Sequence, residues 1–219
     1  MEHLQGRIVA DSYGFPVVDL MTDGPVGHRC RAAVREDAYR IRQAALRGVG
    51  CEPRGPPHGA YLGDMRIAVA NDHAGTDLKN ELAAWLRSEG HEVVDFGTHT
   101  HQAADLPDYI YPAALAVARG EADRGVFVDG VGYGSAMIAN KLPGVFAAVA
   151  QDPFCARLAR EHSDTNVLCI GGKIIGSALA LEVVKAWMRA DYLGTTEPKY
   201  ARRVGKVAEI AARHVRPLA

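Results

Sequence analysis

Apolar and polar positions alternate in two rhythms from Met65 onward. Short runs with apolar centres predict buried strands at 66–70, 91–97, 125–130, 144–150 and 166–172. Stretches with apolar residues every three or four positions predict helices at 76–88, 107–120, 134–141, 153–162, 177–188 and 200–214. Apolar strands that alternate with helices are typical of a parallel sheet covered on both faces. We therefore predict an α/β fold, a doubly wound, Rossmann-like three-layer sandwich with a five-stranded parallel sheet.

Residues 1–64 do not follow this rhythm. They are rich in glycine and proline, with turn-forming segments such as "EPRGPPHG", around one predicted helix at 29–47. We expect residues 1–64 to be an N-terminal extension of uncertain role and residues 65–214 to form the domain.

Charge and composition indicate which classes of binding partner and which cellular location to expect for this protein. The formal net charge of the 219 residues is −1 and no basic run is present, so we expect neither nucleic acid nor a membrane as partner. The start of the chain does not resemble a secretory signal, and no apolar run is long enough to span a bilayer. The four cysteines form no CxxC pair, and we expect them to be buried free thiols of a cytoplasmic protein.

Polar residues gather where predicted strands end, which is where ligands bind in such folds. The third strand runs into "DGVGYG", where Gly130, Gly132 and Gly134 could direct backbone N–H groups at an anion. This GxGxG spacing satisfies neither the dinucleotide fingerprint nor a P-loop. A tight strand-to-helix turn would explain the glycines equally well.

Other candidate side chains each have a functional and a structural interpretation. Asp72 and His73 follow the first strand, and could act in a site or simply cap a helix and meet solvent. His162 ends a helix, where its charged form would be stabilised, but a lone histidine at such a position more often has a structural role. Lys199 and Arg203 could hold a phosphate or form a solvated helix face. His99, His101 and Asp105 lie in a polar loop without a further soft ligand, so we predict no metal site.

Together and in order, these segments resemble one family. The segments "MRIAVANDHAGTDLKNEL", "VVDFGT", "EADRG", "ANKLPG" and "ARLAREHSDTNVLCIGG" are similar to the ribose-5-phosphate isomerase type B family, which includes the galactose-6-phosphate isomerase subunits. The resemblance covers the chain after residue 64. It implies interconversion of aldose and ketose phosphates through a cis-enediolate, without a metal or organic cofactor.

The resemblance also implies roles for individual residues. The glycine turn would stabilise the enediolate as an oxyanion hole, and His162 with Asp72 would open the sugar ring. Substrate-binding residues would be His73, Gly130, Gly132, Gly134, Asn140, Lys199 and Arg203. Members of the family pair into dimers with sites at the interface, so we expect a homodimer or a dimer of dimers.

One position departs from the family in a way that bears on catalysis. The family's usual base is a cysteine in a Cys-Gly-Thr-Gly-x-Gly turn, and here the turn begins with Asp129. A second branch places a glutamate base further along the turn, where this chain has Ser135. Asp129 is our candidate base for a pentose or hexose phosphate, although a carboxylate is a weaker base than a thiolate.

Two alternatives remain open. In the galactose-6-phosphate isomerase system, the subunit that lacks the cysteine also carries Val-Asp at this position. The protein could therefore be a non-catalytic subunit that completes a cysteine-bearing homologous partner, or a sugar-phosphate-binding module. Activity of the purified homomer would separate these hypotheses from the first.

Overall fold

The computed structural model describes residues 7–10, 16–19 and 65–214. The chain divides into two compact units, Met1–Ala33 and Val34–Ala219. In the first unit, β1 (Arg7–Ala10) pairs antiparallel with β2 (Pro16–Asp19), a pairing that the sequence did not predict. The helix predicted at 29–47 lies outside the described residues, and the role of residues 1–64 stays a prediction.

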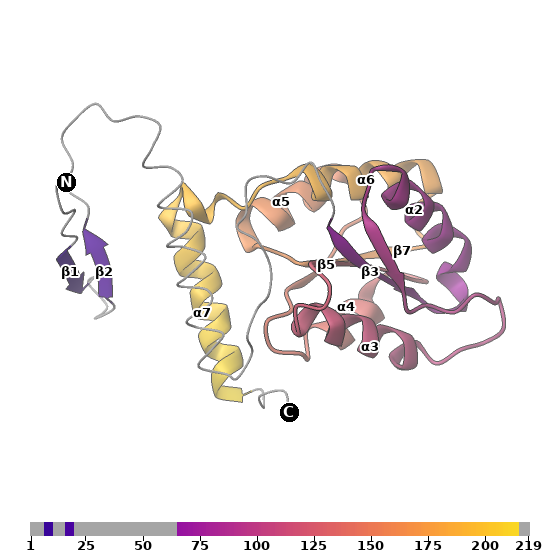
Figure 1. Cartoon of the computed structure of the whole chain (residues 1–219), viewed down its shortest axis with the longest axis horizontal. Helices are drawn as coiled ribbons and strands as arrows, with labels where there is room; N and C mark the ends of the chain where they lie inside the picture. Colours follow the sequence, from indigo (N-terminus) through magenta and orange to yellow (C-terminus); the bar gives the residue numbers. More distant parts are fainter. Residues whose placement is uncertain (1–6, 11–15, 20–64, 215–219) are drawn as a thin grey trace. The chain divides into compact units, whose positions relative to one another are not determined.

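A five-stranded parallel sheet forms the centre of the second unit, as predicted (Figure 1). Its strand order is β4-β3-β5-β7-β6, so the chain starts near one edge and then crosses the middle. The strands are β3 (Arg66–Asn71), β4 (Glu92–Asp95), β5 (Arg124–Asp129), β6 (Ala147–Val149) and β7 (Val167–Gly171).

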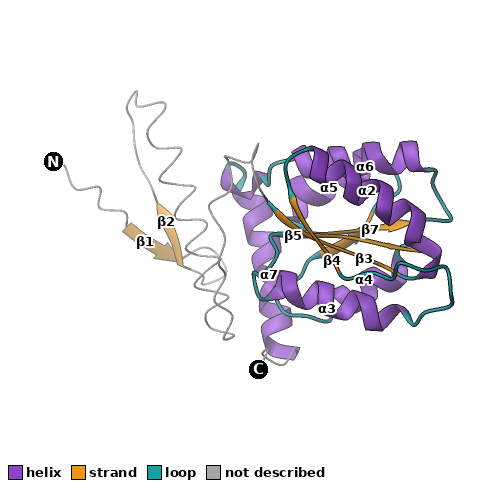
Figure 2. Ribbon diagram, turned by 45° about the vertical axis from the view of Figure 1, so that its right-hand side comes forward, coloured by secondary structure: helices purple, strands orange, loops and turns teal. Residues whose placement is uncertain are grey.

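Helices cover both faces of the sheet, which confirms the three-layer prediction (Figure 2). One face carries α2 (Thr76–Ser88), α5 (Pro153–Ser163) and α6 (Ser177–Arg189), and the other carries α3 (Leu106–Ala118) and α4 (Tyr133–Ala139). Short 3₁₀ helices, η1 (His73–Gly75) and η2 (Leu193–Thr195), occupy two connections.

The amphipathic spacing of α2 explains why it packs on the sheet. Leu78, Leu82 and Leu86 recur every four residues, share one face and are buried in the core that also holds Trp187 of α6. Burying each leucine contributes about 1.5–3 kcal/mol. The opposite core, under α3 and α4, is built mainly from small residues such as alanine, which allows close helix–sheet packing.

The strand β6 is shorter than the predicted run at 144–150. The side chain of Asn166 donates to the Gly144 carbonyl and accepts from the Phe146 amide, each at 2.8 Å. These bonds replace ladder pairing at the start of the run, so the ladder begins only at Ala147.

The last helix, α7 (Pro198–His214), packs against α5 and η2. It is amphipathic, yet it has no buried residue within the part of the chain described, and Val207 and Ile210 are exposed. Across the described residues, no helix is both long and apolar enough to cross a bilayer.

Candidate active site

The carboxyl ends of β3, β5 and β7 bring the predicted strand-end residues together. In the register of the sheet, Asn71 lies opposite Val128 and Asp129 lies opposite Gly171. Asp72 and Asp129 therefore leave neighbouring strands at about the same level, with strands about 4.8 Å apart. We call this end of the sheet the carboxyl edge, and the opposite end the amino edge.

The loop after β3 holds Asp72 and His73. The Asp72 carboxylate accepts the Ala74 N–H through Oδ1 at 2.9 Å, so it caps η1 as the structural interpretation expected. Its second oxygen accepts no hydrogen bond from the described residues. Nδ1 of His73 is buried and has no partner among those residues, and such a group usually acquires one from water or a ligand.

The Asp129 carboxylate is folded back into the glycine turn. Only 3% of the residue is exposed. Oδ1 accepts the N–H of Val131 at 2.8 Å and of Gly132 at 2.5 Å. Oδ2 accepts both the N–H of Ser135 at 2.8 Å and its hydroxyl at 2.6 Å. These four bonds match the lone-pair capacity of an ionised carboxylate.

The glycine turn thus divides its backbone donors into two sets. The N–H groups of Val131, Gly132 and Ser135, here called the inner amides, all hold Asp129. The N–H groups of Gly130, Tyr133 and Gly134, here called the outer amides, donate to no acceptor in the described part of the chain. Gly132 is buried, whereas Gly130 and Gly134 are partly exposed. Of the three predicted glycine donors, two therefore remain available.

Two of these glycines are required by the turn. Gly132 has a φ of 85°, which side chains rarely adopt, and a Cβ there would lie 3.0 Å from Val149. A Cβ at Gly134 would lie 2.6 Å from Leu106 and 3.6 Å from Oδ2 of Asp129. The Leu106 side chain therefore occupies the space that a side chain at Gly134 would need, close to Oδ2.

The two described cysteines differ in burial. Cys169 is buried as predicted, and its burial together with the negative charge of Asp129 raises the pKa of the thiol well above its ordinary value. Cys155 is exposed, contrary to the expectation of buried thiols. It follows the N-cap of α5, and a hydrogen bond to Asp152 raises its pKa. Cys30 and Cys51 lie outside the described residues.

A second group of predicted residues surrounds Tyr200. The His162 imidazole stacks on the Tyr200 ring, with the centroids 4.3 Å apart and the planes at 10°. Lys199 Nζ lies 4.9 Å and the Arg203 guanidinium 5.9 Å from the same ring. Lys199 also pairs with Glu197 at 3.2 Å. We call His162, Lys199, Tyr200 and Arg203 the Tyr200 cluster.

The Tyr200 cluster and Asp129 lie at opposite edges of the sheet. His162 is near the end of α5, and β7 begins at Val167, whereas Asp129 is level with the last residue of β7, Gly171. Since β7 has five residues, its ends are roughly 13 Å apart at about 3.3 Å per residue. One chain therefore does not bring the two groups around a single sugar.

Asn140 does not point its amide at a ligand. Its Nδ2 donates to the Ala147 carbonyl and its Oδ1 accepts the Ala147 N–H, both at 2.9 Å. The side chain thus fastens the end of α4 to the start of β6, and this structure does not join it to the other predicted site residues.

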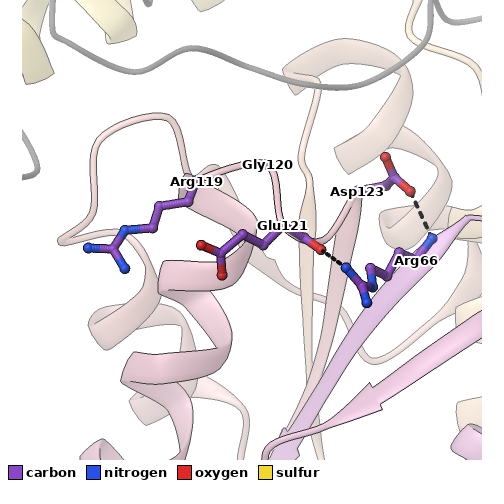
Figure 3. A pocket seen from close by; sticks show the side chains of 5 residues that line it. All are labelled: Arg66, Arg119, Gly120, Glu121 and Asp123. Atoms are coloured by element: carbon purple, nitrogen blue, oxygen red, sulfur yellow. Dashed lines mark hydrogen bonds between the residues drawn. The ribbon is translucent and has the colours of Figure 1, made fainter.

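A hollow of about 470 Å³ opens at the amino edge, away from Asp129 (Figure 3). Its lining residues are Arg66, Arg119, Gly120, Glu121 and Asp123. The Arg66 side chain is already bound, because its guanidinium pairs with Glu92 at 2.9 Å and donates to the Glu121 carbonyl at 3.4 Å. The Asp123 carboxylate accepts the backbone N–H of Arg66 at 2.7 Å. None of the predicted site residues lines it.

Three residues near the two groups were not predicted as site residues. Ser135 binds Asp129, Tyr200 stacks on His162, and the Lys173 side chain lies next to Gly130, 3.8 Å from where a Cβ would be. The contact between His162 and Tyr200 joins positions far apart in sequence, and no periodicity signals it. The "DGVGYGS" turn did hold a signal for Ser135, since helix-start hydroxyls commonly bind nearby acceptors.

Comparison with known proteins matches the chain to one family of isomerases. The family described as Ribose/Galactose Isomerase matches residues 67–207. Ribose-5-phosphate isomerase B of Escherichia coli is 41% identical over 68% of this chain and 97% of its own length. The structure of Clostridium thermocellum ribose-5-phosphate isomerase B superposes with a TM-score of 0.66 at 43% identity, covering 68% of this chain and 99% of that one. The Mycoplasma genitalium enzyme, with ribulose-5-phosphate bound, has a TM-score of 0.64 at 30% identity, covering 67% and 96%.

Proposed function

Because the chain belongs to the Ribose/Galactose Isomerase family, we propose that it interconverts the aldose and ketose forms of a pentose or hexose phosphate, with Asp129 as the base. The relatives support the substrate class, since the Escherichia coli protein is named a ribose-5-phosphate isomerase and the Mycoplasma genitalium structure holds ribulose-5-phosphate. The sequence resemblance adds that no metal or organic cofactor takes part.

The observation that supports this proposal best is that the glycine turn has two sets of backbone N–H groups. The inner amides hold a carboxylate at the carboxyl end of β5, and the outer amides at Gly130 and Gly134 stay free beside it. A base and free N–H donors are the two components that an enediolate reaction needs. Gly132, by contrast, serves the base and not the substrate.

The proposed reaction moves one proton between two neighbouring carbons. Asp129 takes the proton from the carbon next to the carbonyl, and the electron pair forms the enediol double bond as negative charge moves to the carbonyl oxygen. The N–H groups of Gly130 and Gly134 stabilise that oxygen. Asp129 then returns the proton to the former carbonyl carbon. At the same time the hydroxyl proton on the neighbouring carbon moves to the former carbonyl oxygen, so that neighbouring carbon becomes the new carbonyl and the aldose and ketose forms are exchanged.

Ring opening and phosphate binding fall to the other residues. Asp72 and His162 exchange protons with the ring oxygen and the anomeric hydroxyl, and His73 contributes a buried nitrogen without a partner in the described part of the chain. Lys199 and Arg203 provide positive charge for the phosphate, and lysine supplies charge without the bidentate geometry of arginine.

A second copy of the chain would complete this site. Asp129 and the Tyr200 cluster lie at opposite edges of the sheet in one chain, so a single molecule cannot supply both to one sugar. A two-fold dimer would bring the Tyr200 cluster of one copy to the carboxyl edge of the other. The amphipathic α7, which has no buried residue in the described structure, offers an apolar face for such pairing.

Complementation tests the function and the dimer together. Asp129→Asn and His162→Gln, each inactive alone, would be co-refolded and assayed on ribose 5-phosphate, ribulose 5-phosphate and six-carbon aldose phosphates. If sites are shared across a two-fold interface, half of the dimers are mixed and each has one intact site, so about a quarter of the wild-type activity returns. Two inactive variants that never complement would refute the shared site, and an inactive wild type would refute the homomeric enzyme.

A non-catalytic subunit is the second candidate, and one observation favours it. All four lone-pair positions of Asp129 already accept hydrogen bonds, so the carboxylate as held has none free for a proton. Under this alternative, the homomer binds sugar phosphate without turnover, and activity appears only on mixing with a cysteine-bearing homologous subunit.

A further inference from the structure

The hydrogen bonds of Asp129 differ in how easily they can be released. Three donors are backbone N–H groups, those of Val131, Gly132 and Ser135. Their directions are fixed by the turn and by the first residues of α4. Gly132 is especially constrained, because its positive φ and its close packing on β6 and β7 leave the turn little freedom.

The fourth donor is the hydroxyl of Ser135, and it alone turns about a single bond. Its Oγ lies 2.6 Å from Oδ2 of Asp129, and Ser135 is fully buried, so water does not compete for the bond. Rotation of this hydroxyl frees a lone pair on Oδ2 while the N–H of Ser135 still holds that oxygen at 2.8 Å. The carboxylate keeps its orientation as it gains a free acceptor position.

The freed position lies beside Gly134 and the partly exposed Leu106 of α3. Oδ2 lies below Gly134, where a Cβ would stand 3.6 Å from it, and the N–H of Gly134 is one of the outer amides. A substrate oxygen held by that amide would place the neighbouring carbon on the same side as Oδ2.

From this geometry we infer that Ser135 is a positioning residue that gates the base: its hydroxyl holds Oδ2 of Asp129 in the resting site and turns away when the substrate proton is taken. The inference rests on the proposed isomerase function. The proton passes from the substrate carbon to Oδ2 and back to the adjacent carbon, and the hydroxyl keeps its own proton throughout. Ser135 itself does not touch the substrate.

The test measures deuterium entry from D₂O into saturating ribose 5-phosphate and ribulose 5-phosphate. In Ser135→Ala, Oδ2 keeps a permanently free lone pair and no hydrogen bond to a charged acceptor has to be broken, so the exchange rate rises roughly tenfold. KM stays within about twofold, because the outer amides and the cationic residues are unchanged. Ser135→Cys, whose thiol is a weaker donor, gives an intermediate rate. Ser177→Ala, an exposed serine at the start of α6, serves as the matched control.

The possible outcomes distinguish the proposed role of Ser135 from the proposed isomerase activity. Exchange that rises in the order serine, cysteine, alanine supports the gate, and so does exchange that appears only in Ser135→Ala. A wild type that exchanges while Ser135→Ala is no faster overturns the gate and leaves the isomerase intact. Silence in the wild type and in both variants, with thermal unfolding still cooperative, overturns the proposed function and the gate with it.

Discussion

The imidazole of His162 and the ring of Tyr200 lie face to face, 4.3 Å apart between centroids. The pair joins the end of α5 to the start of α7 and sets the orientation of the imidazole. It also brings His162 close to the charges of Lys199 and Arg203, which surround the same aromatic ring.

Replacing Tyr200 tests whether the stack orients a working histidine. Tyr200→Leu loses an aromatic pair worth about 0.5–1.5 kcal/mol, so turnover of ribose 5-phosphate should fall about two- to tenfold. Tyr200→Phe keeps the stack and should keep the rate. Erythrose 4-phosphate cannot close a furanose ring because its terminal hydroxyl carries the phosphate. If His162 acts in ring opening, Tyr200→Leu spares this substrate, and an equal loss on both sugars would argue for a packing role.

Asn140→Ala should weaken the fold and leave substrate affinity unchanged. The variant removes two hydrogen bonds to the backbone of Ala147, which at about 0.5–1.5 kcal/mol each lowers the free energy of unfolding by roughly 1–3 kcal/mol. Urea denaturation gives the stability, and KM for ribose 5-phosphate gives the affinity. A stable variant with a raised KM would return Asn140 to the substrate-binding residues.

Two ion pairs of the same i,i+4 spacing, one within α5 and one between α5 and its C-cap residue Asp164, allow a comparison of stability. Arg160 and Asp164 are buried, with Nη1 and Oδ1 2.6 Å apart, whereas Arg157 and Glu161 have the same spacing nearer the surface. Asp164→Ala leaves a buried guanidinium without its carboxylate and should cost about 3–5 kcal/mol. Glu161→Ala should cost about 0–1 kcal/mol. Equal losses in urea denaturation would contradict this difference.

The raised pKa of Cys169 predicts a pH dependence of stability. The folded thiol stays protonated above its ordinary pKa of 9.0, whereas the thiol of the unfolded chain ionises there. The unfolded state therefore binds fewer protons, and the free energy of unfolding falls as pH rises above about 9, by up to about 1.4 kcal/mol per pH unit. Cys169→Ala removes this contribution, so its stability should decline less steeply from pH 8.5 to 10. Parallel slopes would contradict the assignment.

The sequence predicted the five-stranded sheet and the α-helices that cover it because each of these elements carries a local pattern. The apolar run at 66–70 and the leucine spacing of α2 can be recognised from the local sequence alone, without knowledge of the residues they contact in the fold. The start of β6 was misplaced because the Asn166 side chain, from a distant loop, takes over the backbone groups of Gly144 and Phe146.

The site was only partly predictable for a related reason. Strand-end positions placed Asp72 and Asp129 near each other, since parallel strands end at one edge. The closing of the turn around the Asp129 carboxylate, and the use of Asn140 to fasten α4, depend on side-chain directions in the folded chain. The direction in which the side chains of Asp129 and Asn140 point cannot be recognised from the order of residue types in the sequence.

Proton exchange monitored by NMR in D₂O tests the role of Asp129 most directly. The wild type would be incubated with aldose and ketose phosphates of four to six carbons, beside Asp129→Asn and a control, Asp152→Asn, which removes a strand-end carboxylate that caps α5. If Asp129 is the base, the wild type and Asp152→Asn carry deuterium into the carbon next to the carbonyl, and Asp129→Asn does not. Exchange in Asp129→Asn at the wild-type rate would contradict the account, as would a wild type that binds these sugars and exchanges none.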